Sequence, residues 1–509
     1  MALLAPAAAA LLLLALMAAA WAWDYAVARL VLRPRAVAAA FRAQGVQGPP
    51  YRFLRGSNGD IRRMRAEADA AAAAAAARLD VRDHDYLPRV MPHFLAWKRR
   101  YGAPFLYWFG AQPRVCLLDY DNVRQVLRNK SGHFVKNDTH PTILAMLGKG
   151  LVLVEGADWV RHRRVLNPAF AMDKLKMMSA TMAGCAERLI TGWEELASSS
   201  SGTGQVEVEF SRQFQDLTAD VISHTAFGSS YKEGKEVFHT QQQLMRIALA
   251  TFLNVQLPGF KYLPTKSNRL KWKLEKKIKT TLMGIIQPRQ ASARSGGYGD
   301  DLLGLMLQAC FTTEQGGKRP DELTLTMDEI IDECKTFFFA GHETTSHLLT
   351  WTMLLLCVYP EWQEQLRREV LRECGGKENP TADMLNKLKE MTMVLLETLR
   401  LYCPVMHMLR RPISDIRLGS LSIPKGTTIA IPIPFLHRDK EVWGDNANEF
   451  DPSRFENGIT NAAKSPQALL SFSIGPRSCK VPTKLVMAIY RSQYVHGDHG
   501  RASARTSRC

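Results

Sequence analysis

The sequence lacks several patterns that would place it in a familiar class. No Cys-x-x-Cys occurs among its nine cysteines, whose spacing is irregular. This excludes a disulfide framework and the usual zinc sites, and it indicates reduced thiols in a cytosol-facing protein. No internal repeat is present, which excludes a solenoid or a propeller. No single block of basic residues dominates, so nucleic acid is not a predicted partner.

What is present is an ordinary globular composition with a basic surplus. Of the 509 residues, 46% are hydrophobic and 23% are charged, which excludes a largely disordered chain and a multi-span transporter. Lys and Arg number 66 against 49 Asp and Glu, a net charge of +17. Such a surplus predicts a negatively charged partner, either an acidic protein or anionic lipid.

The first 23 residues carry no charged side chain and are long enough to span a bilayer. Asp24 is the first charge, and Arg29, Arg33 and Arg35 follow, which favours a cytosolic C-terminal side. The alternative is a cleaved signal peptide, but no basic segment precedes the apolar run. We therefore predict a retained transmembrane anchor over residues 1–23, a hinge and N-terminal segment over 24–90, a catalytic domain over 91–479 and a disordered tail over 480–509.

The residues from 326 to 358 predict one long buried helix. Thr326 and Glu329 form a capping-box pattern at its start, and Pro360 ends it. At about 1.5 Å per residue the helix would be almost 50 Å long. Its middle carries Gly341, Glu343 and a threonine pair, and polar groups there are costly unless they are used or satisfied. Two interpretations remain for this segment. It is either a functional site or a helix kink whose threonine hydroxyls bond within the helix itself.

Three further motifs are each ambiguous alone. Glu397-x-x-Arg400 lies among apolar residues, where either a buried pair joined by Arg454 or an exposed salt bridge is possible. Residues 472–479 place Cys479 after a Gly-Pro-Arg turn, which suits either a single thiolate ligand or a buried free thiol. Trp159 and Arg163 share one helical face that can bind an anion, whereas the remaining basic residues of that segment fit an exposed basic surface: Arg161, His162 and Arg164.

The order of these motifs resembles that of the cytochrome P450 superfamily, the haem-thiolate monooxygenases. The match covers residues 45–479, and Phe-x-x-Gly-x-Arg-x-Cys at 472–479 is its most specific element. Residues 44–52 and 337–345 resemble the membrane-anchored plant clan that includes cytokinin hydroxylases, brassinosteroid- and gibberellin-inactivating enzymes and fatty-acid hydroxylases. The resemblance implies a mainly α fold with a small β-region, one hairpin of which fits residues 416–423.

The resemblance also implies roles for individual residues. Cys479 would be the proximal thiolate ligand of haem b (iron protoporphyrin IX), and Glu343 with Thr344 would relay protons on the distal side, over the iron. Gly341 would open the groove for oxygen and substrate. Glu397, Arg400 and Arg454 would form a structural triad behind the haem. The remaining haem-binding positions would be Trp159, Arg163, Arg410, Phe472, Gly475 and Arg477.

The implied reaction is hydroxylation of an apolar plant metabolite, a hormone or a fatty acid, with O₂. No Gly-x-Gly-x-x-Gly or flavin motif occurs, so electrons would come from a separate NADPH-cytochrome reductase of the endoplasmic reticulum membrane, facing the cytosol. The loops near residues 130–150 and 250–265 are apolar-rich and predict no polar recognition of the substrate.

The resemblance stops after Cys479. Residues 480–509 carry Pro482 and a His/Arg/Ser/Gly-rich tail where the family has a helix and strands, so we expect the C-terminal part of the fold to be truncated. Two alternatives to the monooxygenase follow. One is a non-catalytic truncated isoform or gene-model product. The other is a reductase-independent haem-thiolate isomerase or dehydratase, against which the Glu343–Thr344 pair counts.

Overall fold

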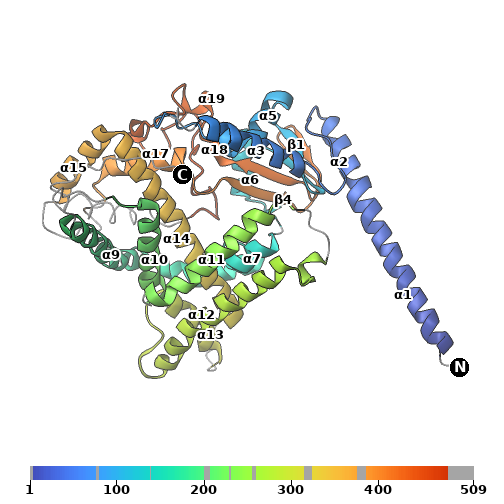
Figure 1. Cartoon of the computed structure of the whole chain (residues 1–509), viewed down its shortest axis with the longest axis horizontal. Helices are drawn as coiled ribbons and strands as arrows, with labels where there is room; N and C mark the ends of the chain where they lie inside the picture. Colours follow the sequence, from blue (N-terminus) through green and yellow to red (C-terminus); the bar gives the residue numbers. More distant parts are fainter. Residues whose placement is uncertain are drawn as a thin grey trace.

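The computed structural model shows a mainly helical body, a small sheet region at one side and an N-terminal helix that projects from it (Figure 1). It describes residues 4–75, 80–137, 139–199, 207–228, 231–254, 259–314, 324–374, 384 and 386–479. This architecture agrees with the predicted fold class. The predicted disorder and truncation concern residues 480–509, which lie outside the described residues.

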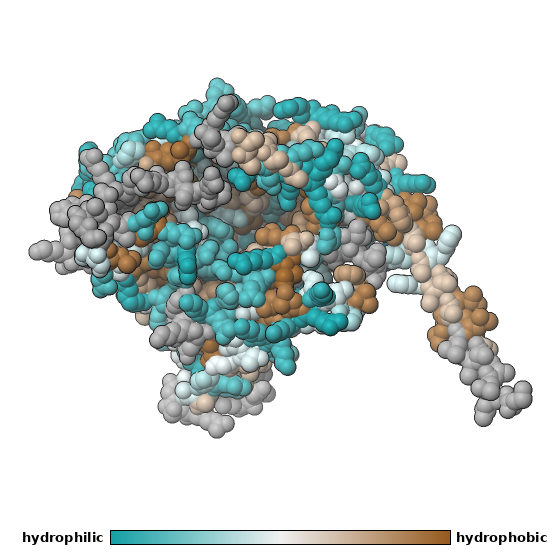
Figure 2. All heavy atoms as spheres, viewed as in Figure 1, coloured by the Kyte–Doolittle hydropathy of each residue, from teal (hydrophilic) through white to brown (hydrophobic). Residues whose placement is uncertain are grey.

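The projecting helix consists of α1 (Leu4–Asp24), the π-helical η1 (Tyr25–Leu32) and α2 (Arg33–Arg42). Within the described residues, the stretch Leu12–Arg42 is the one helix long and apolar enough to cross a membrane, by length and composition. Its apolar side chains over residues 12–23 are exposed, as Figure 2 shows in brown, whereas Leu30, Val37 and Phe41 are buried against the body. The helix therefore changes from a free apolar segment to a docked one at about Leu30.

The main sheet has the strand order β1-β2-β7-β4-β3. β2 and β7 are parallel and the other pairs are antiparallel. The predicted hairpin is confirmed, because β5 and β6 pair antiparallel over residues 416–423. The strands are β1 (Phe105–Phe109), β2 (Gln112–Cys116), β3 (Phe134–Val135), β4 (His407–Pro412), β5 (Ile416–Leu418), β6 (Leu421–Ile423) and β7 (Thr428–Pro432).

The predicted long helix is α14 (Met327–Val358), which crosses the middle of the body (Figure 1). Both halves of the capping box are present: the Glu329 N–H donates to Thr326 Oγ1, and the Thr326 N–H donates to the Glu329 carboxylate. The helix ends at Val358, and its C-cap Tyr359 directly precedes Pro360. α10 (Phe210–Phe227) packs along it, and α17 (Lys389–Leu401) carries the Glu-x-x-Arg motif.

The other helices surround α14 and pack on both faces of the sheet. Aromatic residues of α5, with Phe94 and Trp97 buried, pack on β1. These helices are α3 (Asn58–Ala75), α4 (Leu87–Val90), α5 (Pro92–Tyr101), α6 (Tyr120–Arg128), α7 (Pro141–Leu147), α8 (Gly156–Leu166), η3 (Asn167–Phe170), α9 (Met172–Ser199), α11 (Tyr231–Thr251), η4 (Phe260–Tyr262), α12 (Lys266–Gly296), α13 (Leu302–Glu314), α15 (Pro360–Cys374), α18 (Ile433–Leu436), α19 (Lys440–Trp443) and η6 (Pro452–Phe455).

Candidate functional site

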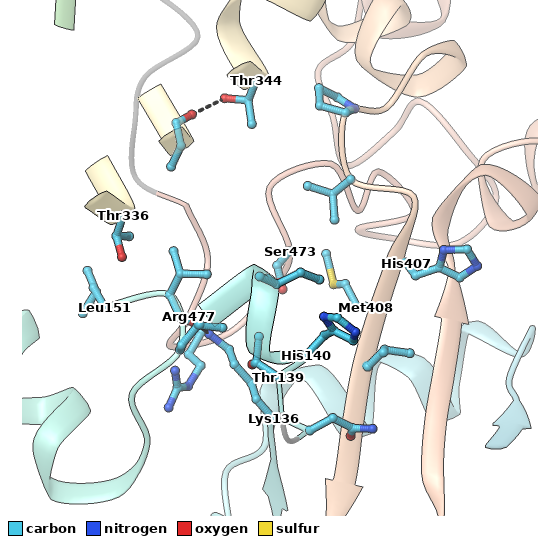
Figure 3. Close-up of a pocket in the computed structure, with 18 of the residues that line it drawn as sticks. Lys136, Thr139, His140, Leu151, Thr336, Thr344, His407, Met408, Ser473 and Arg477 are labelled. Carbon is cyan, nitrogen blue, oxygen red and sulfur yellow. Dashed lines mark hydrogen bonds between the residues drawn. The ribbon is translucent and has the colours of Figure 1, made fainter. Parts of the chain in front are cut away.

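A cavity of about 1120 Å³ lies between α14, α8, the strand β4 and the loop that carries Cys479. Figure 3 shows its walls: Thr336 and Thr344 come from α14 on one side, and Ser473 and Arg477 come from the cysteine loop on another. Most of the lining is apolar. This volume exceeds the few hundred Å³ of a small ligand pocket and accommodates a large prosthetic group together with a substrate.

The cysteine loop, residues 472–479, is held in a compact turn. The Cys479 N–H donates to the Phe472 carbonyl at 2.9 Å, and both residues line the cavity. Gly475 has φ +82°, and a Cβ there would lie 2.8 Å from Arg128 Cα and 2.8 Å from the Leu127 carbonyl. Only glycine fits this close approach to α6. The glycine of the motif therefore brings the loop against the body.

Cys479 differs from the other described cysteines in its surroundings. Cys116, Cys185, Cys334 and Cys403 are buried, and burial raises the pKa of their thiols, for Cys403 to about 11. Buried thiols of this kind stay protonated and do not ligate iron. Among the described cysteines, Cys479 alone is exposed and lines the cavity.

Cationic side chains gather at the cavity wall beside the cysteine loop. Trp159 and Arg163 of α8 both line the cavity from one helical face, as predicted, and Arg410 reaches it from β4. Arg477 bonds to Glu155 and places its guanidinium 4.8 Å from the centre of the Trp159 ring. The pKa of Arg410 is lowered by burial and then by the neighbouring Arg477 cation.

Lys136 belongs to this group, although the sequence did not single it out. It lines the cavity next to Arg477 (Figure 3), and its ammonium donates to the Val152 carbonyl. Burial, and then the charges of Arg477 and Arg410, lower its pKa to about 7. No local pattern marks Lys136, because the two cations that act on it, Arg410 and Arg477, lie hundreds of residues away along the chain.

Two buried donors in this cluster have no hydrogen-bond partner among the described residues: Arg163 Nη2 and Arg477 Nη1. Arg477 pairs with Glu155, whose carboxylate also acts by charge on Lys136 and Arg410. Buried donors and charges without partners are unfavourable unless a ligand satisfies them. The wall therefore fits a large apolar group that carries acidic side chains, which is the chemistry of a haem and its propionates.

The opposite wall is formed by the middle of α14. Thr344 and Gly341 line the cavity, and Thr344 Oγ1 donates to the Ala340 carbonyl at 2.7 Å. A Cβ on Gly341 would lie 2.7 Å from Ile222 Cδ1, so the glycine allows α10 to approach α14 closely. The hydroxyl that was expected above the cofactor therefore faces the cavity, and the glycine also has a packing role.

Glu343 does not share this wall. It lines a second, smaller cavity of about 230 Å³ together with His342 and Gln242. Its carboxylate oxygens lie 3.8 Å from His342 Nε2 and 3.8 Å from His347 Nε2. Successive helical residues point about 100° apart, so adjacent side chains face different surroundings. The structure thus separates Glu343 from Thr344, which the sequence had placed together.

The prediction of a basic surface for residues 161–164 is wrong for His162. This side chain is fully buried, and its Nδ1 lies 2.5 Å from Glu333 Oε1 on α14. Arg161 is mostly buried too and binds Glu329, whereas Arg164 is exposed. Burial alone would lower the pKa of His162, but its bonds to Glu333 and Glu329 raise it. These contacts fix α8, and with it Trp159 and Arg163, to the long helix.

Glu397, Arg400 and Arg454 are in contact, which resolves the ambiguity of the Glu-x-x-Arg motif. Arg400 and Glu397 are fully buried and bond twice, at 2.6 and 2.7 Å, and Arg454 Nε lies 3.4 Å from the same carboxylate. The remaining Arg400 donors reach the backbone carbonyls of His437, Ala447 and Glu449. This network joins α17 to the segment that leads to the cysteine loop.

The expectation that the loop near residues 130–150 offers no polar groups is wrong. Lys136, Asn137, Thr139 and His140 line the cavity (Figure 3). Asn137 donates to Thr428 at 2.6 Å, and its Oδ1 is buried without a partner among the described residues. Apolar residues of the same segment, Pro141 and Ile143, line the cavity beside them, so this wall is mixed in polarity.

Comparison with known proteins accounts for this arrangement. The family model "Cytochrome P450" matches residues 89–480. Cytochrome P450 709B1 of Arabidopsis thaliana is 44% identical over 92% of this chain and 89% of its own length. Cytochrome P450 734A6 of Oryza sativa subsp. japonica is 42% identical over 88% and 82%. Secologanin synthase 2 of Catharanthus roseus is 39% identical over 90% and 85%. The chain belongs to the cytochrome P450 family of haem monooxygenases, in its plant branch.

Proposed function

We propose that this enzyme hydroxylates an apolar plant metabolite, a hormone or a fatty acid, at haem b, using O₂ and electrons from an NADPH-dependent reductase. One observation carries the proposal. Cys479, Arg163 and Arg477 line the same cavity, each arginine with one buried N–H that has no partner among the described residues, and the opposite wall carries the Thr344 hydroxyl. A thiolate ligand, propionate donors and a hydroxyl for proton transfer are the groups that such a site requires.

The protein would bind the haem, orient the substrate and supply protons to the reaction. The haem, when bound, supplies oxygen activation. Cys479 would hold its iron, and Trp159, Arg163, Arg410 and Arg477 would hold its propionates, assisted by Lys136. Phe472 and Gly475 would shape the loop against its proximal face. The apolar lining would exclude water from the reacting group.

Proton delivery would involve two residues on different faces of α14. Thr344 faces the main cavity, so its hydroxyl would donate the proton there. Glu343 faces the second cavity, where Gln215, Gln242 and Arg246 provide polar surroundings. We infer that Glu343 collects protons on that side and that Thr344 passes them to the reaction. The Glu397, Arg400 and Arg454 network would keep the cysteine loop in place.

The partner and location follow from charge and from the N-terminal helix. The chain has a net charge of +17, which complements an acidic docking face on a reductase and anionic lipid near the anchor. The exposed apolar helix before Asp24 would cross the endoplasmic reticulum membrane once, with the haem domain, residues 91–479, on the cytosolic side.

The test is the reduced, carbon monoxide-bound difference spectrum of the full chain in membranes, compared with Cys479→Ser. We expect a long-wavelength, thiolate-type Soret peak that the variant loses. A spectrum without that peak in the unaltered chain would refute haem ligation by Cys479 and support a non-catalytic product. Turnover of a peroxide without NADPH would instead indicate the isomerase chemistry.

A further inference from the structure

A buried histidine, His84, joins two tyrosines where the C-terminal ends of α14 and α17 meet the segment before α4. His84 is 3% exposed. Its Nδ1 lies 2.8 Å from the Tyr402 hydroxyl, and its Nε2 lies 2.9 Å from the Tyr359 hydroxyl. The Tyr402 ring also stacks on Trp351, with the ring centres 3.9 Å apart and the planes 5° from parallel. None of these residues has a role in the proposed haem site.

The direction of the two hydrogen bonds follows from burial. Burial, and then the Arg438 cation, lower the pKa of His84 to about 4, so the imidazole is neutral at pH 7 and has one N–H and one acceptor nitrogen. Among the described residues, His84 is the one hydrogen-bond partner of the buried Tyr402 hydroxyl, whereas Tyr359 is partly exposed and can donate to water. Because a buried donor without an acceptor is unfavourable, Tyr402 donates to Nδ1, and the Nε2–H is donated to Tyr359.

These rings connect the neighbourhood of the main cavity with the surface. Trp351 follows Leu348 of α14 by three residues, about one helical turn, and Leu348 lines the cavity. Tyr402, the C-cap of α17, follows Leu399 by the same spacing, and Leu399 lines the cavity too. At the other end of the hydrogen-bonded chain, the Tyr359 ring is partly exposed. The stacked pair therefore lies one turn behind the cavity wall, and the histidine links it to solvent.

Tyrosine and tryptophan are side chains that give up an electron readily. An oxidised phenol is a strong acid, and in an apolar core it loses its proton together with the electron, because a buried cation without a partner is unfavourable. This requires a base at hydrogen-bond distance, which His84 provides for Tyr402. Tyr120 shows the contrast. It is buried as well, but its hydroxyl donates to the Leu436 carbonyl, which is too weak a base to take the proton.

We infer that Tyr402 and His84 form a redox-active pair that takes up one oxidising equivalent from the haem cavity when no substrate is there to react. One electron passes from Tyr402, by way of Trp351, to the oxidised group in the cavity, and the Tyr402 proton moves to His84 Nδ1. The Nε2 proton moves to Tyr359, which releases its own hydroxyl proton to water. The products are a neutral tyrosyl radical, a cavity group reduced by one electron, and one proton in solvent. The inference rests on the proposed function, because oxygen activation at the haem supplies the oxidant.

The test treats the haem-loaded full chain with a peracid in the absence of substrate and records the electron paramagnetic resonance spectrum after rapid freezing. We expect a tyrosyl radical signal that Tyr402→Phe loses, because phenylalanine keeps the stacked ring but has no hydroxyl proton to give. His84→Gln keeps a polar partner that is not a base, so it should lose most of the signal too. Both variants should bleach their haem faster than the unaltered chain. Tyr262→Phe, at a tyrosine that is 72% exposed, is the matched control and should change neither readout.

An unchanged radical signal in either Tyr402→Phe or His84→Gln would overturn the inference and leave the cluster a packing feature. The inference is also overturned if Tyr262→Phe removes the signal. A variant that does not fold is recognised by loss of the carbon monoxide spectrum, and the other variant then decides. If the unaltered chain itself gives no thiolate-type spectrum, the proposed function fails first. An intact thiolate-type spectrum without a tyrosyl radical is a distinct outcome, which refutes the redox pair alone.

Discussion

The contact between His162 and Glu333 predicts a large and pH-dependent loss of stability when it is broken. Both side chains are fully buried, they lie 2.5 Å apart, and the second oxygen of Glu333 has no hydrogen-bond partner among the described residues. His162→Leu would leave a buried carboxylate without the imidazole donor that it binds. Breaking one half of such a pair costs about 3–5 kcal/mol. Glu333→Gln keeps an acceptor and should cost about 1–3 kcal/mol.

The sign of the pH dependence follows from the histidine. The folded-state pKa of His162 is raised above its ordinary value, because the bonds to Glu333 and Glu329 outweigh the effect of burial. The ion pair therefore stabilises the fold fully below the unfolded pKa of about 6.5, and this contribution is lost as the pH rises through the folded pKa. The stability gap between wild type and Glu333→Gln should be larger at acidic than at alkaline pH.

Urea denaturation of the full chain, followed by tryptophan fluorescence, measures these differences. Arg164→Gln serves as the control on the same helix, because that side chain is exposed. The double variant His162→Leu with Glu333→Leu should recover most of the loss, since it buries no unpaired charge. A His162→Leu variant within about 1 kcal/mol of wild type, or a gap that grows with pH, would refute the reasoning.

Three other predictions test the remaining elements. Arg400→Lys should lower the free energy of unfolding by about 3 kcal/mol, because three donors replace five that are all bonded, and urea denaturation measures this. Gly475→Ala should cost about 2–4 kcal/mol and reduce the thiolate-type carbon monoxide peak, because the new Cβ would meet the backbone of Arg128. Thr344→Ala should reduce product formed per NADPH consumed by about tenfold or more while substrate binding is retained, as chromatography of the products will show.

Local signals in the sequence were sufficient for the main elements. The capping box at Thr326 and the proline at 360 predicted both ends of α14, because caps and prolines act within one turn of the residues they affect. The alternation over residues 416–423 likewise predicted the β5–β6 hairpin. Motif order placed Trp159, Arg163, Arg410 and Cys479, and all four line one cavity.

Contacts between residues far apart in the sequence could not be predicted from local patterns. His162 lies in a run of basic residues that is typical of a surface, and its partner Glu333 lies 171 positions further along the chain. Arg114 and His407 come from strands separated by most of the sequence, so their common position at the cavity required the fold. The separation of Glu343 from Thr344 could have been predicted from the sequence, since adjacent helical residues point about 100° apart.

Buried arginines differ in how their donors are satisfied, and an unmet donor is not by itself a sign of the cavity, because Arg438 and Arg65 also have donors without a partner among the described residues and do not line it. All donors of Arg400 bond to other groups of the protein. Its substitution should therefore lower stability, and it should affect catalysis only as a consequence of that loss. Arg163, Arg477 and Arg114 each keep a buried N–H without a partner among the described residues, and all three line the cavity. An unmet donor that faces a cavity raises the free energy of the empty protein and is relieved by a ligand. Substitution of Arg163 or Arg477 should therefore weaken binding of the acid-bearing cofactor more than it weakens the fold.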